Sequence, residues 1–286
     1  MVPAFARREV RVDVVPLKKF VKPYKDAGAF NSLLAPHRFI DDSVFLTKSN
    51  QLGVVVSAEG IDYECLTEAT LESHTKRAAA AWRSFDERFR LYQYVLKQDR
   101  APIDQRTDYH SPAVRKTIQD RRDHLQSKAA GLYTLQLVYV LLYEHPILTE
   151  NNALKRTVST KKVLRVVMDE LERNRAILLA RAHSFQRSLG DLLGLTFLNK
   201  REAFAFFRLL TNLDPSTAAA ERLKYDSHVD YYMASSTLAC TGEGIRIGQA
   251  QLEVLSLKEP PHNTFPNILR DLLALETNFI LCSEFK

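Results

Sequence analysis

The sequence predicts an α+β fold in which two β-β-α-β units form a largely antiparallel sheet covered by helices, with a helical middle region. Segments of alternating apolar and polar residues occur in pairs around polar turns, which is typical of antiparallel hairpins. Each hairpin is followed by a helical pattern and a further strand pattern. This order appears within residues 37–143 and again within residues 229–286. We expect the helices to lie over one face of the sheet.

The first unit begins with a hairpin. Residues 44–48 and 52–58 have the pattern of its two strands, and the polar turn between them contains Asn50. Asparagine tolerates the left-handed backbone that such turns need. The second strand is expected to continue through residues 61–65 after a kink at Gly60.

A helix and a strand complete this unit, and another helix and strand follow it. Thr67 is a typical N-cap, and the apolar residues after it share one helical face: Leu71, Ala78, Ala81, Trp82 and Phe85. Residues 89–97 alternate in polarity and predict a strand. The pair Ser111-Pro112 is a typical helix start, because proline is favoured in the first turn. Residues 132–143 predict a buried strand.

The middle region, residues 144–228, is predicted to be helical. A long helix begins at Thr160 and carries apolar residues spaced at sevens: Leu164, Leu171, Leu178, Phe185 and Leu192. Such a stripe can face the core of its own domain or form an interface with another subunit, and both alternatives stay open. Asn199 and Glu202 resemble a capping pair for a further helix that ends before Pro215.

The second unit repeats the order of the first. Residues 230–240 and 245–257 predict a hairpin around the turn 241–244, residues 265–275 predict a helix, and residues 278–286 predict a strand. Two such units fit in one sheet. We therefore expect residues 37–286 to form one composite domain.

Residues 1–36 form a basic lead-in arm in this interpretation. Prolines interrupt any long helix there. Four lysines are candidates for contact with an anion or an anionic membrane surface: Lys18, Lys19, Lys22 and Lys25. The alternative is a partly ordered arm without such a role.

The composition is that of a soluble protein in a reducing compartment. There are 40 Lys+Arg residues against 34 Asp+Glu residues, giving a formal net charge of +6. This excess is compatible with nucleic acid or an anionic membrane as a partner. Cys65, Cys240 and Cys282 are far apart, which favours neither a disulfide framework nor a zinc knuckle. The longest apolar stretch, residues 132–143, is about half of the roughly 20 residues that a membrane-spanning helix needs.

Several motifs of catalysis and nucleotide binding are missing from the sequence. It contains no G-x-x-x-x-G-K-[ST] loop to bind phosphates, no G-x-S-x-G elbow and no H-E-x-x-H pair. The glycine cluster TGEGIRIG lacks the phosphate-binding lysine and lies in a predicted turn. No catalytic or nucleotide-binding residue is therefore assigned.

Two clusters are weak candidates for a metal site. The first predicted hairpin carries Asp41, Asp42, Asp62 and Glu64, which can gather around a divalent cation or simply protect the sheet edge from unwanted pairing. The second cluster is Asp226, His228 and Asp230, which share one side of an extended segment. No second histidine lies near it in the sequence, so the metal prediction for this chain is none.

The hairpin segment resembles the start of the conjugal-transfer and type IV secretion ATPases of the TrbE/CagE/VirB type. The pattern D-x-V-x-L-x-K appears as Asp42 to Lys48, and G-x-D-x-E appears as Gly60 to Glu64. The residues that we assign to this pattern are Asp42, Lys48, Gly53, Gly60, Asp62 and Glu64. Asn50 stands where the family turn has glycine. The later strand 132–143, the helical middle and the closing segment ALETNFILCSEF resemble the same family.

This resemblance implies a role in a larger machine. Family members are cytoplasmic ATPases that energise pilus biogenesis and substrate transfer, and their nucleotide site belongs to a RecA-like C-terminal domain with Walker motifs. We expect the chain to be an isolated N-terminal domain that does not hydrolyse ATP, with ATP and magnesium bound by a C-terminal domain absent from it. Its expected location is the cytoplasmic face of the bacterial inner membrane. Its expected partners are inner-membrane components and neighbouring subunits in a dimer or hexamer of the full protein.

Two other functions remain as alternatives. The basic excess is compatible with a nucleic-acid-binding module that contacts transferred DNA, and the acids of the first hairpin are compatible with a metal-dependent hydrolase. No cofactor is expected in this chain.

Overall fold

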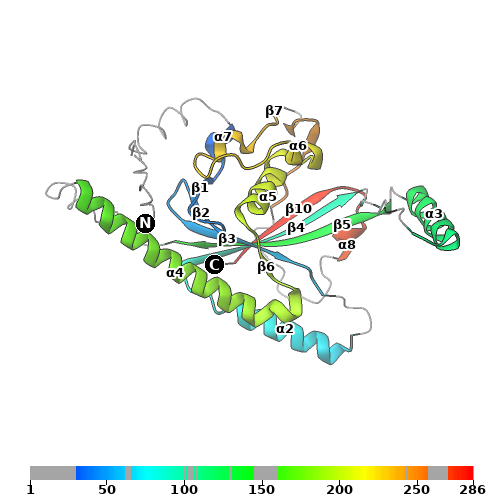
Figure 1. The fold of residues 1–286 in the computed structure, drawn as a ribbon, viewed down its shortest axis with the longest axis horizontal. Coiled ribbons are helices and arrows are strands. Elements are labelled where there is room, and N and C mark those ends of the chain that lie inside the picture. The colour runs from blue at the N-terminus through cyan, green and yellow to red at the C-terminus, as the bar shows by residue number, and fades with distance from the viewer. Residues whose placement is uncertain are drawn as a thin grey trace, which may run out of the picture.

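The computed structural model describes the following residues: 30–61, 66–99, 101, 103, 106, 109–128, 131–144, 160–242, 244–256 and 270–285. Its largest feature is a seven-stranded sheet with helices on both faces (Figure 1). All the strand pairs in this sheet are antiparallel. The α+β class with a helical middle region is therefore confirmed.

The strands of the main sheet lie in an order that differs from the sequence order. Six of them follow one path: β1 (Pro36–Phe39), β2 (Val44–Thr47), β3 (Leu52–Ala58), β5 (Tyr133–Tyr143), β4 (Phe89–Asp99) and β10 (Phe279–Phe285). The short strand β6 (Thr196–Phe197) pairs with β3. Strands β3 and β5 therefore lie at the centre of the sheet, and β4 lies between β5 and the edge strand β10.

The predicted first hairpin is present as β2 and β3. Asn50 has φ 65°, the left-handed conformation that was expected at this turn. Gly53 lies opposite Phe45 in the register. A Cβ atom at Gly53 would overlap the ring of Phe45 and the side chain of Leu142, so this strand position accepts only glycine. The close approach explains why a glycine stands inside a strand.

Two helices cover one face of the sheet. They are α2 (Glu68–Trp82) and α4 (Thr160–Leu193). The hydroxyl of Thr67 accepts a hydrogen bond from the backbone N–H of Thr70 at 3.3 Å, which confirms the predicted N-cap of α2. The core on this side joins sheet residues such as Val54 and Tyr139 to Leu178 of α4.

Further helices cover the opposite face, so the expectation of helices over one face was wrong. They are α5 (Lys200–Asn212) and α7 (Asp230–Met233), with α6 (Pro215–Ala220) packed on α5 and η1 (Phe30–Leu33) packed on α7. Asn199 forms the predicted capping box of α5 with Glu202. The physical reason for two covered faces lies in β3, where Val54 and Val56 enter one core and Val55 enters the other.

The second unit differs in part from its prediction. Its hairpin forms a separate three-stranded sheet of β7 (Leu238–Thr241), β8 (Gly244–Ile247) and β9 (Ala250–Leu252). The expected start of that hairpin is helical, because residues 230–233 form α7. After α8 (Arg270–Ala274), the last strand β10 returns to the main sheet and pairs with β4. The remaining helix, α3 (Pro112–Ser127), lies at the end of β4 and β5 away from α4 (Figure 1).

Candidate functional site

The acids of the first hairpin do not form a free metal-binding group. Oδ1 of Asp41 accepts backbone hydrogen bonds from Ser43 at 2.8 Å and Val44 at 2.7 Å, and its other oxygen pairs with Arg175. Burial alone would raise the pKa of Asp41, but these bonds more than offset it and hold that pKa below its usual value. Asp42 is exposed, and its backbone carbonyl accepts a 2.5 Å hydrogen bond from the N–H of Lys200.

The rest of this acidic group and the N-terminal arm lie outside the described residues. These positions are Asp62, Glu64, Lys18, Lys19, Lys22 and Lys25. Asp41 itself shapes the turn before β2 and ties it to α4, which is a structural role.

The apolar stripe of α4 faces the core of the chain. Leu178 and Phe185 are almost fully buried, and Leu171 and Leu192 pack against the same cluster. The side chain of Leu164 lies outside the described residues. Leu178 and Phe185 are therefore core residues, and the partly buried Leu171 and Leu192 pack on the same side, which favours the core-facing alternative. Helical spacing alone does not distinguish the two roles.

The predicted group Asp226, His228 and Asp230 is brought together only in part. Asp226 points elsewhere and pairs with Nζ of Lys200 at 2.9 Å. Its place is taken by His37 of β1. One ligand atom from each of His37, His228 and Asp230 lies within 4.8 Å of the other two, and we call these three residues the histidine–aspartate cluster.

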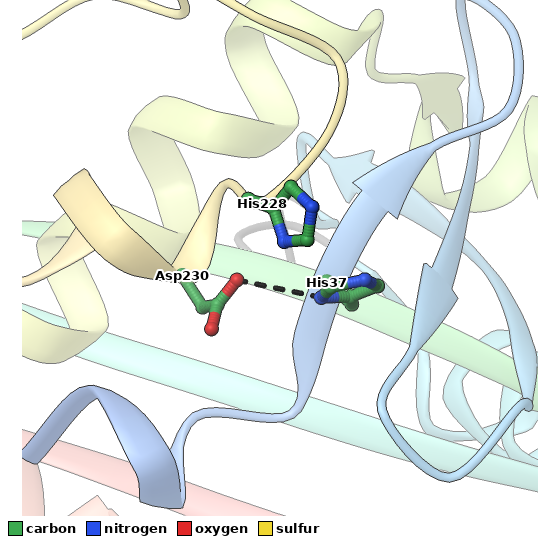
Figure 2. A group of neighbouring side chains, drawn as sticks. All are labelled: His37, His228 and Asp230. Atoms are coloured by element: carbon green, nitrogen blue, oxygen red, sulfur yellow. Dashed lines mark ion pairs between the residues drawn. The ribbon is translucent and has the colours of Figure 1, made fainter. Parts of the chain in front are cut away.

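Figure 2 shows how the cluster is assembled. His37 approaches from β1, His228 from the segment that leads into α7, and Asp230 from the first residue of that helix. Nδ1 of His37 lies 3.5 Å from Oδ1 of Asp230. The rings of His37 and His228 meet edge to face, with centroids 4.8 Å apart. One ring nitrogen of His228 points toward the other two side chains.

Lys48 holds the opposite side of the cluster. Its Nζ lies 3.0 Å from Oδ2 of Asp230 and donates a 2.6 Å hydrogen bond to the carbonyl of Asn31. Only 3% of the Asp230 side chain is exposed, compared with 24% of the Lys48 side chain. A buried carboxylate without a cation would be costly, so Lys48 stabilises the ionised form of Asp230.

The backbone fixes the segment that carries His228 and Asp230. The N–H of Phe39 donates to the carbonyl of Asp226 at 2.6 Å, and the N–H of Val229 donates to the carbonyl of His37 at 3.0 Å. His228 has φ 54°, a left-handed conformation that is uncommon for residues other than glycine but is adopted more often by Asn, Asp and His than by other residues. These bonds place the two histidines on adjacent pieces of chain.

The electrostatics of the cluster favour an ionised aspartate and a neutral histidine. Burial alone would raise the pKa of Asp230, but the interactions with His37 and Lys48 outweigh it and lower that pKa. Burial, followed by the nearby His37 and Arg38, lowers the pKa of His228 despite the opposing charge of Asp230. A carboxylate and an unprotonated imidazole are the forms that bind metal ions.

A basic hollow of about 480 Å³ begins beside this cluster. Its lining residues are Arg38, Lys200, Arg201, Leu223, Lys224, Tyr225, Asp226 and Ser227, and we call it the basic hollow. Lys200 pairs with Asp226, and Lys224 pairs with Glu221 at 2.7 Å. Arg38 and Arg201 are exposed and form no ion pair within the described part of the chain. The side chain of Tyr225 is 69% exposed at the same place.

The sequence alone pointed to three of the four residues that meet here, the cluster members His228 and Asp230 and their partner Lys48. It did not point to His37. Lys48 was assigned as a family-pattern residue, and His228 and Asp230 as a weak metal candidate. His37 precedes the first hairpin and carries no local signal, because only the pairing of β1 with the distant segment 226–229 brings it to His228.

No helix in the described portion of the chain is both long enough and apolar enough to cross a membrane.

Comparison with known proteins identifies the central part of the sheet. No curated protein matches the chain significantly. Residues 43–151 match the family model of the type IV secretion system ATPase VirB4/TrbE, N-terminal domain. This range contains strands β2, β3, β4 and β5 with α2 and α3, and it includes Lys48 and Gly53. Over residues 43–151 the chain is therefore similar to the N-terminal domain of the VirB4/TrbE family of type IV secretion ATPases.

Proposed function

We propose that the chain is an assembly and docking domain of a type IV secretion ATPase that energises pilus biogenesis and substrate transfer in conjugation. The observation that supports this proposal is the family match over residues 43–151. That range supplies four adjacent strands at the centre of the main sheet, together with α2 from the covering layer. Its partners in this proposal are inner-membrane components of the secretion system and neighbouring copies of the full ATPase.

In this proposal ATP and magnesium are bound by a separate C-terminal domain of the full protein. The sequence lacks the glycine-rich loop and lysine that bind nucleotide phosphates. We expect the purified chain to hydrolyse no ATP above background. Specific hydrolysis that survives further purification would contradict this part of the proposal.

Docking is tested by co-purification. The tagged chain is mixed with detergent-solubilised inner membranes that contain its cognate secretion system, and retained secretion components are identified by mass spectrometry. Excess untagged chain should displace them, whereas a basic protein of another fold should not. Retention that resists the untagged chain, or that the unrelated protein equally displaces, would count against a specific docking surface.

A position at the cytoplasmic face of the inner membrane is the second part of the proposal. Support comes from the four lysines of the N-terminal arm, Lys18, Lys19, Lys22 and Lys25. Vesicles that contain phosphatidylglycerol should retain the chain at low salt and release it as ionic strength rises, since salt screens exposed charges. Replacing the four lysines with glutamine should abolish this binding. Equal binding to neutral vesicles would contradict the electrostatic contact.

The basic hollow favours a second candidate function, contact with the transferred DNA. Arg38 and Arg201 supply exposed cations, and the ring of Tyr225 can stack on a base. Binding of a single-stranded oligonucleotide should weaken steeply with salt, because phosphate contacts release counterions.

A double variant tests this second function. Arg38→Gln with Arg201→Gln should reduce the slope of log affinity against log salt by about 1.4, since each phosphate contact on a single strand contributes about 0.7. Arg83→Gln with Arg187→Gln is a control of equal charge at exposed positions outside the hollow. The same slope in both double variants would show that the hollow is not the DNA-binding site.

A further inference from the structure

Two buried polar atoms of the histidine–aspartate cluster face each other without a hydrogen bond. Nδ1 of His37 and Oδ1 of Asp230 are inaccessible to solvent, and neither has a hydrogen-bond partner among the described residues. Their separation of 3.5 Å is longer than a normal N–H···O bond. The two atoms meet only as an ion pair, and a buried polar atom without a hydrogen bond is costly, so one cation bound between them would satisfy both.

The side chains have the chemistry of a zinc site. Two imidazole nitrogens and one carboxylate oxygen form the donor set of zinc sites that keep a fourth position open. Metal ions bind the carboxylate form of aspartate and the neutral form of imidazole. The donor set therefore matches zinc better than calcium or magnesium, which prefer oxygen ligands alone.

The distances between the ligand atoms are close to those that a zinc ion requires. Ligand atoms about 2.0 Å from a tetrahedral zinc ion lie roughly 3.3 Å from each other. The His37–Asp230 pair is already 3.5 Å apart. The third ligand atom comes from His228, an exposed residue, and all three atoms lie within 4.8 Å of one another. A small rotation of His228 completes the set (Figure 2).

Lys48 does not occupy the position that zinc requires. Its ammonium lies on Oδ2 of Asp230, so Oδ1 remains directed at His37. The lysine orients the carboxylate for a single-oxygen contact. Outer partners of this kind fix ligand orientation in many metal sites.

We propose that His37, His228 and Asp230 bind one zinc ion, with water as the fourth ligand on the exposed side of His228. The ion joins β1 to the segment that leads into α7, two parts of the chain that are far apart in sequence. It fastens the helices of the second face to the edge of the sheet. Because a folded site binds the ion better than the unfolded chain does, zinc stabilises the fold.

The test uses the full chain without an affinity tag, with its three cysteines replaced by serine so that thiols do not bind the metal. After treatment with a chelator, the protein is titrated with Zn²⁺ by calorimetry, and its thermal unfolding is followed with and without Zn²⁺. We expect one Zn²⁺ per chain and a higher Tm. Co²⁺ in place of Zn²⁺ should give the visible absorption of a four-coordinate site.

Two variants make the test specific. His228→Asn removes the imidazole but tolerates the left-handed backbone, so the fold is kept while Zn²⁺ binding weakens by at least about tenfold. Asp226→Asn is the matched control in the same segment, because its side chain pairs with Lys200 outside the cluster. This control should bind Zn²⁺ like the parent protein. Absence of Zn²⁺ binding in the parent, or equal affinity in His228→Asn, would overturn the proposal.

Discussion

The ammonium of Lys48 lies 3.0 Å from Oδ2 of Asp230, and this contact joins the VirB4/TrbE-type hairpin to the helices of the second face. Lys48 follows β2, whereas Asp230 is the first residue of α7. The pair is mostly shielded from solvent. A residue inside the family match therefore compensates the charge of a carboxylate far outside it.

Replacing Lys48 with methionine should leave Asp230 buried without its cation. We expect the free energy of unfolding to fall by about 2–3 kcal/mol, below the value for a fully buried pair because a quarter of the lysine side chain is exposed. Urea denaturation measures the change. The double variant Lys48→Met with Asp230→Asn should recover part of the loss. Additive losses in the two single variants would show that the pair is not coupled.

Replacing Gly53 with alanine should destabilise the first hairpin. The added methyl group would overlap Phe45 and Leu142, and forcing extra atoms into a packed core typically costs about 1–3 kcal/mol. Gly131→Ala is the matched control, because no atom lies within 4 Å of a Cβ placed there. Thermal unfolding of the two variants should separate them clearly. Equal Tm values would contradict the close approach at Gly53.

Arg208 holds three helices together from a fully buried position. Its guanidinium donates to the carbonyls of Thr217, Ala218, Tyr232 and Met233 and to the hydroxyl of Ser235. Burial lowers its pKa. Arg208→Met should reduce the free energy of unfolding by at least about 3 kcal/mol, since several buried carbonyls lose their donors.

Arg201, an exposed arginine on the same helix, provides the control for the Arg208 variant. Arg201→Met removes the same charge from the surface of the same helix and should change stability by no more than about 0.5 kcal/mol. A small effect at Arg208, similar to that at Arg201, would mean that water replaces the guanidinium contacts.

Asp214, the N-cap residue of α6, should make the stability of the folded chain depend on pH in a predictable direction. The hydroxyls of Ser216 and Thr217 and the backbone N–H of Thr217 donate to Asp214, which lowers its pKa from 3.8 to about 2. A carboxyl whose pKa is lower in the folded state contributes stability above its unfolded pKa. That contribution is lost as the pH falls from about 4 to about 2.

Asp214→Asn keeps a good capping residue but does not titrate. The Tm difference between the parent chain and this variant should be constant above pH 4 and should change between pH 4 and pH 2. A difference that stays constant across that window would contradict the lowered pKa of Asp214.

Local signals in the sequence predicted the elements whose reasons are local. Asn50 adopts the left-handed turn conformation, Thr67 caps α2, and Asn199 forms a capping box with Glu202. Each of these features depends on residues within a few positions of one another. The alternating pattern of residues 89–97 likewise predicted most of β4.

The features that the sequence did not predict correctly depend on contacts between residues that are far apart in the sequence. Residues 230–233 were predicted as a strand, yet Arg208 binds the carbonyls of Tyr232 and Met233 in a helical turn. His37 joins His228 because β1 pairs with a segment far along the chain. Tertiary contacts of this kind leave no periodic signal. Only a three-dimensional structure reveals the complete histidine–aspartate cluster.

The most direct test of docking is the frequency of substrate transfer in cells that carry the cognate type IV secretion system and also express this chain. If the chain docks as the full ATPase does, it competes for the same partners, and transfer should fall progressively as its expression rises. A chain with Gly53→Val, which should not fold, serves as the control and should leave transfer unchanged. Unchanged transfer when the folded chain is more abundant than the full ATPase would contradict a docking role.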